Sequence, residues 1–244
     1  MRVQLTLVAA GAALLAPTTL PDAPPPPVPG PQSRVRTGPE AHKPAKDGRE
    51  EPVRAADLLA KVRDCRPVSR GRYRSDAGLR ADIPVCGAKD AVFWKADMDI
   101  DCDGRPGRLC NSRTDPYFTA ATAFPGSDGG PLDAERLPYI VVPQPSGIWD
   151  HREDGIRGGS VAAVVRGDRL RYAVVGDVGP RDVIGEASHA AARALGVRPD
   201  PRRGGTPSGV TYIVFKDSRV RPIDDRAAAE RLGERLARRF LDED

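Results

Sequence analysis

Two carboxylates stand nine residues apart in the segment Tyr172–Val197, YAVVGDVGPRDVIGEASHAAARALGV. An apolar run leads into Asp177 and a Gly/Pro turn, and Glu186 opens a predicted helix. Hydrolysis of a glycosidic bond needs one carboxyl group to protonate the leaving oxygen and another to activate water or attack the sugar. The spacing therefore indicates an acid/base pair in one cleft. The alternative is structural, since Asp is common in turns and Glu in the first turn of a helix.

Four segments resemble the chitosanases of glycoside hydrolase family 75. They are AVFWKADMDIDCDG at 91–104, LDAERLPYIVVP at 132–143, VAAVVRGDRLRYAVVGD at 161–177, and the GDVG and IGEAS pair, all within roughly residues 85–215. The resemblance implies that Asp177 and Glu186 are the catalytic pair. It also implies internal hydrolysis of chitosan or a related amino-sugar polymer, with inversion and without a cofactor.

The same segment resembles a second group, the double-psi β-barrel domains of lytic transglycosylases and expansins. The similarity lies in the strand, the D-x-GP turn and the small-residue helix that ends in ALG. In those domains the Asp before the GP turn acts on a polysaccharide, so this analogy makes Asp177 the expected general acid. It leaves open a peptidoglycan lytic enzyme that needs one Asp, and a non-catalytic wall-binding module is a further alternative.

Length and composition predict a single, mainly β domain with a few helices over residues 55–244, and the resemblance to the second group implies a double-psi-like β-barrel. Frequent Gly and Pro between short apolar runs are typical of many turns. A helix is expected directly after Glu186, ending at Gly196. A last helix, capped by Asp224, should pack an apolar stripe on the barrel. The expected strands are 92–96, 139–142, 161–165, 170–175 and 210–215.

The first 54 residues predict export and a tether. Arg2 precedes an apolar stretch, Leu5–Ala16, that is too short to span a bilayer, so residues 1–23 are read as a signal peptide. Residues 24–54 are rich in Pro and charge and should form a disordered linker. We therefore expect a secreted, extracellular monomer without a membrane anchor.

Four cysteines in an exported chain predict two disulfides, for which three connectivities exist. The pairs Cys65–Cys86 and Cys102–Cys110 are preferred because each closes a short local loop. A zinc site is the rival, but the CxxC spacing of structural zinc sites is absent and no His lies nearby in the sequence. The disulfides should brace the adjacent Asp-rich motif.

That motif, DMDIDCDG at 97–104, places Asp97, Asp99, Asp101 and Asp103 at alternate positions. In a strand all four carboxylates would share one face. Three interpretations compete: a subsite for protonated amino-sugars, an exposed acidic edge, and a calcium loop, whose D-x-D-x-D-G pattern is only partly met. We expect Asp97, Asp99 and Asp101 to bind substrate, and no metal.

Charge distribution agrees with a cationic partner at the motif-bearing segment. The whole chain carries +4, whereas residues 81–160 contain 8 Lys or Arg against 13 Asp or Glu, a net charge of −5. A cationic polymer would be attracted to this segment. Nucleic acid is not expected, because export, few aromatics and the acidic middle oppose it.

Aromatic and histidine residues complete the candidates. Trp149, between Gly147 and Asp150, has a loop-like setting and is predicted to stack on a sugar ring. Histidine chemistry is not expected, because His42 lies in the linker, His151 in a polar loop, and His189 on the helix after Glu186, where it should face solvent. 

Overall fold

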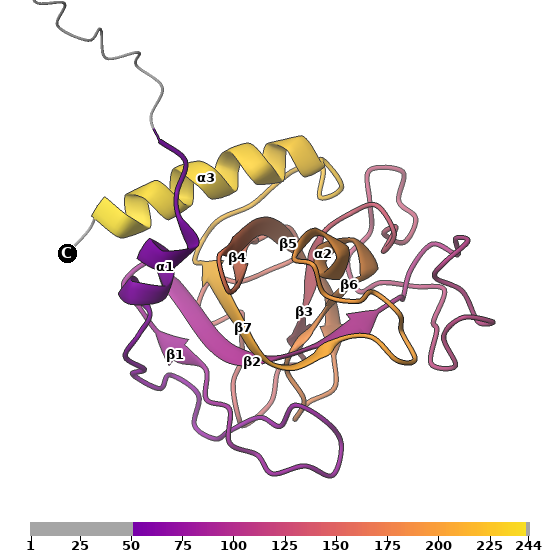
Figure 1. Cartoon of the computed structure of the whole chain (residues 1–244), viewed down its shortest axis with the longest axis horizontal. Coiled ribbons are helices and arrows are strands. Elements are labelled where there is room, and N and C mark those ends of the chain that lie inside the picture. Colours follow the sequence, from indigo (N-terminus) through magenta and orange to yellow (C-terminus); the bar gives the residue numbers. More distant parts are fainter. Residues whose placement is uncertain (1–50, 243–244) are drawn as a thin grey trace, which may run out of the picture. The chain divides into compact units, whose positions relative to one another are not determined.

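Six strands close into a barrel in the computed structural model, which describes residues 51–242 (Figure 1). Neighbouring strands follow the order β1-β2-β6-β3-β5-β4-β7, and β2 also pairs with β7, so that only β1 lies outside the ring. The pairs β2–β6 and β3–β5 are parallel and the other pairs of the ring are antiparallel. The strands are β1 (Cys86–Gly87), β2 (Ala91–Asp101), β3 (Tyr139–Pro143), β4 (Val161–Arg166), β5 (Arg169–Gly179), β6 (Glu186–Ser188) and β7 (Thr206–Phe215).

The prediction of a mainly β barrel with few helices is confirmed, and the five expected strands lie within β2, β3, β4, β5 and β7. Three helices accompany them in residues 51–242: α1 (Ala55–Lys61), α2 (His189–Ala194) and α3 (Arg226–Asp242). None of these helices is long and apolar enough to cross a membrane. The predicted signal peptide and the linker up to residue 50 lie outside the described residues.

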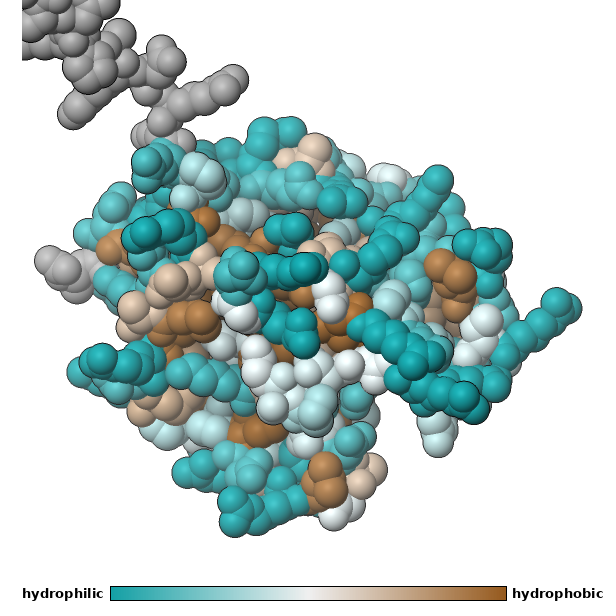
Figure 2. Space-filling view, in the orientation of Figure 1, coloured by the Kyte–Doolittle hydropathy of each residue, from teal (hydrophilic) through white to brown (hydrophobic). Residues whose placement is uncertain are grey.

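Both faces of the central strands are buried, which explains their continuous apolar runs. In β2, Phe93 belongs to one core cluster and its neighbour Trp94 to another. The Phe93 cluster includes side chains of α1 and α3, whereas the Trp94 cluster includes side chains of α2. On the face seen in Figure 2, hydrophobic residues form small separate groups among hydrophilic ones.

The C-terminal helix packs on the barrel as predicted, but Asp225 rather than Asp224 caps it. Asp225 Oδ1 accepts the Ala228 amide at 2.8 Å, whereas Asp224 bonds Ser127. Phe240, 3% exposed, meets Phe215 edge-on with ring centroids 6.0 Å apart. The apolar side of α3, to which Phe240 belongs, packs across β4 and β5.

The helix expected directly after Glu186 begins two residues later than predicted, at His189. Glu186–Ser188 instead forms β6, in parallel pairing with Asp99–Asp101 of β2. Ser188 caps α2, because its Oγ accepts the Ala191 amide at 3.2 Å. The correction matters because Glu186 is held by a strand and not by a helix end.

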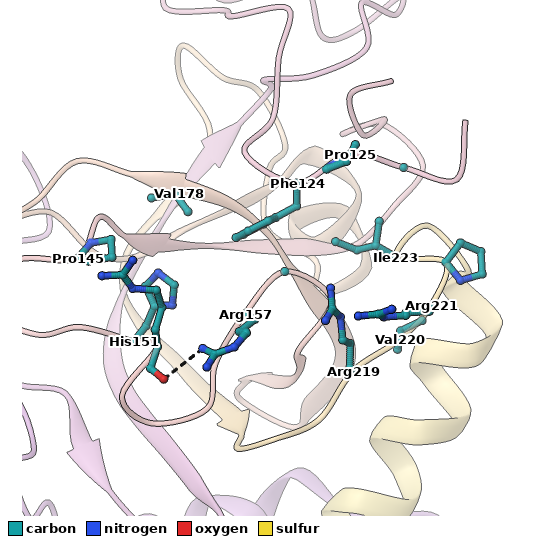
Figure 3. A pocket seen from close by; sticks show the side chains of 14 residues that line it. Phe124, Pro125, Pro145, His151, Arg157, Val178, Arg219, Val220, Arg221 and Ile223 are labelled. Atoms are coloured by element: carbon teal, nitrogen blue, oxygen red, sulfur yellow. Dashed lines mark hydrogen bonds between the residues drawn. The ribbon is translucent and has the colours of Figure 1, made fainter. Parts of the chain in front are cut away.

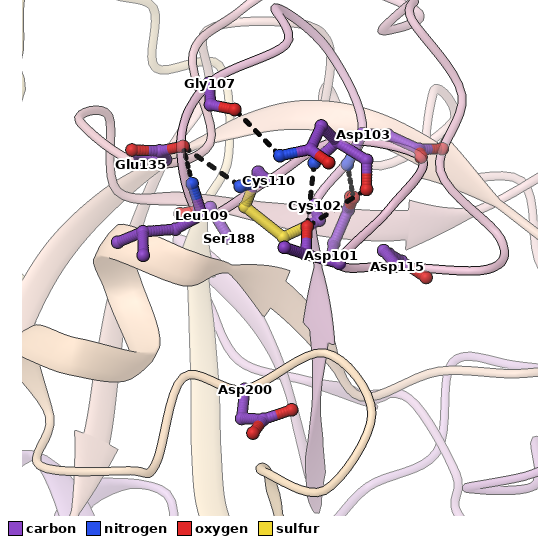
Figure 4. The surroundings of a disulfide bond; sticks show 12 residues. Asp101, Cys102, Asp103, Gly107, Leu109, Cys110, Asp115, Glu135, Ser188 and Asp200 are labelled. Atoms are coloured by element: carbon purple, nitrogen blue, oxygen red, sulfur yellow. Dashed lines mark hydrogen bonds between the residues drawn. A yellow bond between two sulfur atoms is a disulfide. The ribbon is translucent and has the colours of Figure 1, made fainter.

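Both predicted disulfides are confirmed, with Cα separations of 5.1 Å for Cys65–Cys86 and 4.9 Å for Cys102–Cys110. The second bridge closes the loop that follows β2 (Figure 4). Glu135 Oε1 accepts the amides of Leu109 and Cys110 at 2.6 and 2.9 Å and so fixes the same loop. The Asp-rich end of β2 is therefore braced on the side of its exit from the barrel.

We expect Phe240→Ala to lower the free energy of unfolding by about 3–4 kcal/mol, because it removes a buried ring from the contact between α3 and the barrel. Chemical denaturation of residues 51–242 measures this loss. The neighbouring exposed Arg239→Ala should change stability by less than about 0.5 kcal/mol. Equal losses in the two variants would contradict the assigned packing.

Candidate active site

A cavity of about 430 Å³ is lined by residues of β2, β3, β5 and β6 and of nearby loops, and carboxylates dominate its wall. We call it the acidic pocket. Eight carboxylates line it against one arginine, Arg202. They are Asp76, Asp99, Asp101, Asp103, Asp115, Asp177, Glu186 and Asp200. Figure 4 shows Asp101, Asp103 and Asp115 around the Cys102–Cys110 bridge, with Asp200 on a separate loop.

The pairing of two strands brings the Asp-rich motif to the proposed acid/base pair. In the parallel β2–β6 ladder, Asp99 lies opposite Glu186 and Asp101 opposite Ser188. Asp103 follows the strand, and its Oδ1 accepts the Thr119 amide at 2.6 Å. Segments far apart in the sequence thus contribute neighbouring negative charges to one wall.

Asp177 lies near the end of β5 and is held by the backbone. Its Oδ1 accepts two amide hydrogens, from Ala123 and from Val178, each at 2.7 Å. These bonds favour the charged form of the carboxyl group, although burial outweighs them and leaves its pKa raised. Asp177 is therefore fixed in position with its second oxygen free of these bonds.

Glu186 has a different environment, without a hydrogen-bond donor among those described. Burial raises its pKa to about 7, with further contributions from the negative charges of Asp99, Asp103 and Asp177. Its Oε2 approaches Gly179, where a β-carbon would come within 2.7 Å of that oxygen. Gly179 follows Asp177 by two residues on β5, so this close approach brings Glu186 and Asp177 to the same wall.

Of the three aspartates predicted to bind substrate, Asp99 and Asp101 line the acidic pocket. Burial raises the pKa of Asp99 to about 6, aided by Asp76, and holds that of Asp101 well above its ordinary value. Asp97 does not line the pocket. It is 5% exposed and packs on Gly185, whose φ of +123° and missing side chain make room for it.

A cation could be held at one end of this acidic group. Asp76, Asp97 and Asp99 each offer an oxygen atom, and these atoms lie within 4.8 Å of one another. Such a trio suits a protonated amine or a hard metal ion. Within residues 51–242, this is the one set of three or more Asp, Glu, His or Cys side chains whose ligand atoms lie close enough together to share a metal ion.

Trp149 does not provide the sugar platform that its sequence context predicted. It is 5% exposed, and its Nε1 donates to Asp154 Oδ2 at 2.9 Å. The ring meets Trp94 edge-on, with centroids 6.2 Å apart. Because both rings belong to the core, neither offers a face to a ligand, and the expectation for Trp149 is wrong.

An exposed aromatic does lie at the acidic pocket, and sequence reasoning missed it. Tyr117 is 88% exposed and lines the cavity, while Asp115, two residues earlier, accepts its amide at 2.9 Å. The loop DPYFT that carries them has no periodicity to mark a site. The signal that could have marked Tyr117 as a site residue is its position in the sequence, between the Cys102–Cys110 loop and β3.

The histidines stay outside the acidic pocket where they are described. His189 is 4% exposed, because α2 turns its side chain inward, so the expectation that it faces solvent is wrong. His151 is also buried, with Nδ1 at 2.9 Å from the Ile156 carbonyl oxygen. Burial lowers the pKa of both rings. His42 lies outside the described residues.

Comparisons with known proteins point to one family. Residues 98–238 match the family of fungal chitosanases of glycosyl hydrolase group 75. The chain is similar to an Endo-chitosanase C of Aspergillus oryzae, at 35% identity over 61% of this chain, and spans 37% of that relative's length. It is also similar to an Endo-chitosanase of Aspergillus fumigatus, at 30% identity over 61% of this chain and 68% of the relative.

A solved structure, the Streptomyces papain inhibitor, aligns with 55% of this chain and 100% of its own, at 20% identity and a TM-score of 0.32. The matched family region contains Asp99, Asp101, Asp177 and Glu186.

The raised pKa of Glu186 predicts a pH-dependent stability. The unfolded chain ionises this group near pH 4.5, whereas the folded protein holds the proton up to about pH 7. Stability should therefore fall as pH rises through this window. In Glu186→Gln the loss between pH 5 and pH 8 should be smaller by on the order of 1 kcal/mol. Denaturant titrations at both pH values measure it, and Glu153→Gln, exposed, serves as control. An unchanged loss in Glu186→Gln would disprove the assignment.

Proposed function

Because the chain belongs to the chitosanase family of glycosyl hydrolase group 75, we propose that it hydrolyses internal β-1,4 bonds of chitosan in the acidic pocket. The observation that carries the proposal is that eight carboxylates and only one arginine line the acidic pocket, a cavity of about 430 Å³. Chitosan carries a protonated amine on most of its sugars, so this wall complements its charge. A neutral or anionic polymer would gain nothing from the same wall.

Glu186 acts as the general acid and Asp177 as the general base. A carboxyl group with a pKa of about 7 still carries its proton near neutral pH and can donate it to the leaving glycosidic oxygen. Asp177 is the better base, since the amides of Ala123 and Val178 favour its charged form. This reverses the roles suggested by the barrel analogy, in which Asp177 was the acid.

Inversion then proceeds in one step. Asp177 removes a proton from a water molecule as that water attacks the anomeric carbon, while Glu186 gives its proton to the departing sugar. Each carboxyl group changes its charge once, and a proton must return to Glu186 before the next turnover. The net negative wall stabilises positive charge that develops on the sugar ring in the transition state.

Asp99 and Asp101 bind the protonated amines of the sugars flanking the cleaved bond. Both line the acidic pocket, and Asp99 faces Glu186 across the β2–β6 ladder. Tyr117 replaces Trp149 as the platform for a pyranose ring, because its ring is exposed at the same cavity. The two disulfides suit an oxidising compartment, so we propose that the protein is secreted. We also propose that it acts as a monomer.

We expect Asp177→Asn and Glu186→Gln each to lower kcat on chitosan by about 10²–10⁴-fold, since each removes one proton-transfer group. Reducing-end release from chitosan and from peptidoglycan measures the effect. Asp168→Asn and Glu153→Gln, exposed and away from the pocket, should retain full activity. Cleavage of peptidoglycan alone, surviving in Glu186→Gln, would overturn the proposal in favour of a lytic enzyme with one essential Asp.

The inverting mechanism predicts the anomer of the first product. Proton NMR during the first minutes of chitosan cleavage should detect the α-anomer of the new reducing end, before mutarotation mixes the two forms. An initial β-anomer would indicate a covalent intermediate and a shorter separation of the two carboxyl groups.

A further inference from the structure

A second cavity, of about 720 Å³, has the opposite charge to the acidic pocket. We call it the basic cleft. Its wall contains Arg152, Arg157, Arg219 and Arg221, and no Asp or Glu lines it. Phe124, half-buried, contributes an aromatic ring among further apolar side chains (Figure 3). The cleft therefore joins a concentrated positive charge to an apolar surface.

Three of the four guanidinium groups lack a carboxylate partner. Arg152 is paired with Asp150 at 2.7 Å. Arg157 donates only to a neutral group, the Arg152 carbonyl oxygen, at 3.1 Å. Among residues 51–242, no ion pair involves Arg157, Arg219 or Arg221. Several like charges around one cavity repel one another, and a bound anion would relieve that repulsion.

The backbone that carries these arginines is fixed in place. The amide of Val220 donates to the Gly159 carbonyl oxygen at 2.9 Å, which joins the segment after Arg157 to the segment between Arg219 and Arg221. Gly159 has a φ of +83°, and a β-carbon there would lie 2.8 Å from the Val220 carbonyl oxygen. Ser160 Oγ donates to the Ser218 carbonyl oxygen at 3.1 Å. The backbone of the two segments that carry the arginines is therefore joined before any ligand binds.

The basic cleft adjoins the acidic pocket at Val178, which lines both cavities. Phe124 follows Ala123, whose amide donates to Asp177. A ligand on the Phe124 ring would therefore lie beside the residues that position the proposed general base. Chitosan, a polycation, would be repelled here, so the occupant belongs to another chemical class.

We propose that the basic cleft binds an acidic sugar of a glycan. The carboxylate of the sugar accepts hydrogen bonds from Arg157, Arg219 and Arg221, and the apolar face of its ring packs on Phe124. Guanidinium groups suit a carboxylate because their donors match its two oxygens. The ring distinguishes this ligand from a bare anion. The protein would then hold an anionic glycan next to the polymer that it cleaves.

Isothermal titration of the full mature protein with an oligogalacturonate tests the proposal. We expect binding that the double variant Arg157→Gln/Arg219→Gln weakens at least tenfold. The control Arg235→Gln/Arg239→Gln removes the same net charge from exposed positions on α3 and should change the affinity less than twofold. Phe124→Leu should also weaken binding severalfold.

Other outcomes would overturn the proposal. Equal weakening in the two arginine double variants would mean attraction by net charge alone. If Phe124→Leu binds the oligogalacturonate with full affinity, or if the protein binds inorganic phosphate equally well, the cleft is a site for a bare anion. If the oligogalacturonate binds no more tightly than a neutral maltohexaose, the cleft is not a binding site. Chitosan hydrolysis by Arg157→Gln/Arg219→Gln should match the unchanged protein, which shows that the variant is folded. That assay also separates this proposal from the proposed activity.

Discussion

Crowding of like charges along the β2–β6 ladder is the constraint around which this molecule is built. Parallel pairing places Asp99 directly opposite Glu186, and Asp101 and Asp177 lie on the same wall. Each of these carboxyl groups has a raised pKa, with burial as the first cause. Keeping such a group together opposes folding, so the free energy that holds it must come from elsewhere in the domain.

The rest of the fold supplies that free energy on both sides of the acidic pocket. The barrel strands bury both faces, and α3 adds apolar contacts against β4 and β5. The Cys102–Cys110 bridge and Glu135 fix the chain where β2 leaves the barrel. A rigid surround of this kind lets the protein keep carboxyl groups whose repulsion would otherwise push them into solvent, where their pKa values would return to normal.

Patterns within one segment were readable from the sequence, and relations between segments were not. Apolar runs located five strands, short Cys spacings gave both disulfides, and the turn at Asp177 marked the pocket. The sequence EASHAAARAL favours a helix that starts directly after Glu186, whereas pairing with β2 extends Glu186–Ser188 as a strand. Tertiary pairing overrode local propensity there.

The same limit explains the aromatic residues. A Trp between Gly147 and Asp150 resembles a loop residue, yet its partners Trp94 and Asp154 draw it into the core. Tyr117 stands in an unremarkable loop that only the closed barrel brings to the acidic pocket. The exposure of a side chain depends on the assembled fold, so the neighbouring residues in the sequence do not determine it.

Val178 lies between two cavities of opposite charge, so the electrostatic potential changes sign across this part of the surface. A cationic chain that diffuses toward the protein meets attraction on one side of Val178 and repulsion on the other. It should therefore align along the acidic side before any contact with Asp177 or Glu186 forms. This alignment precedes binding, and it should weaken as salt screens the charges of the two cavities.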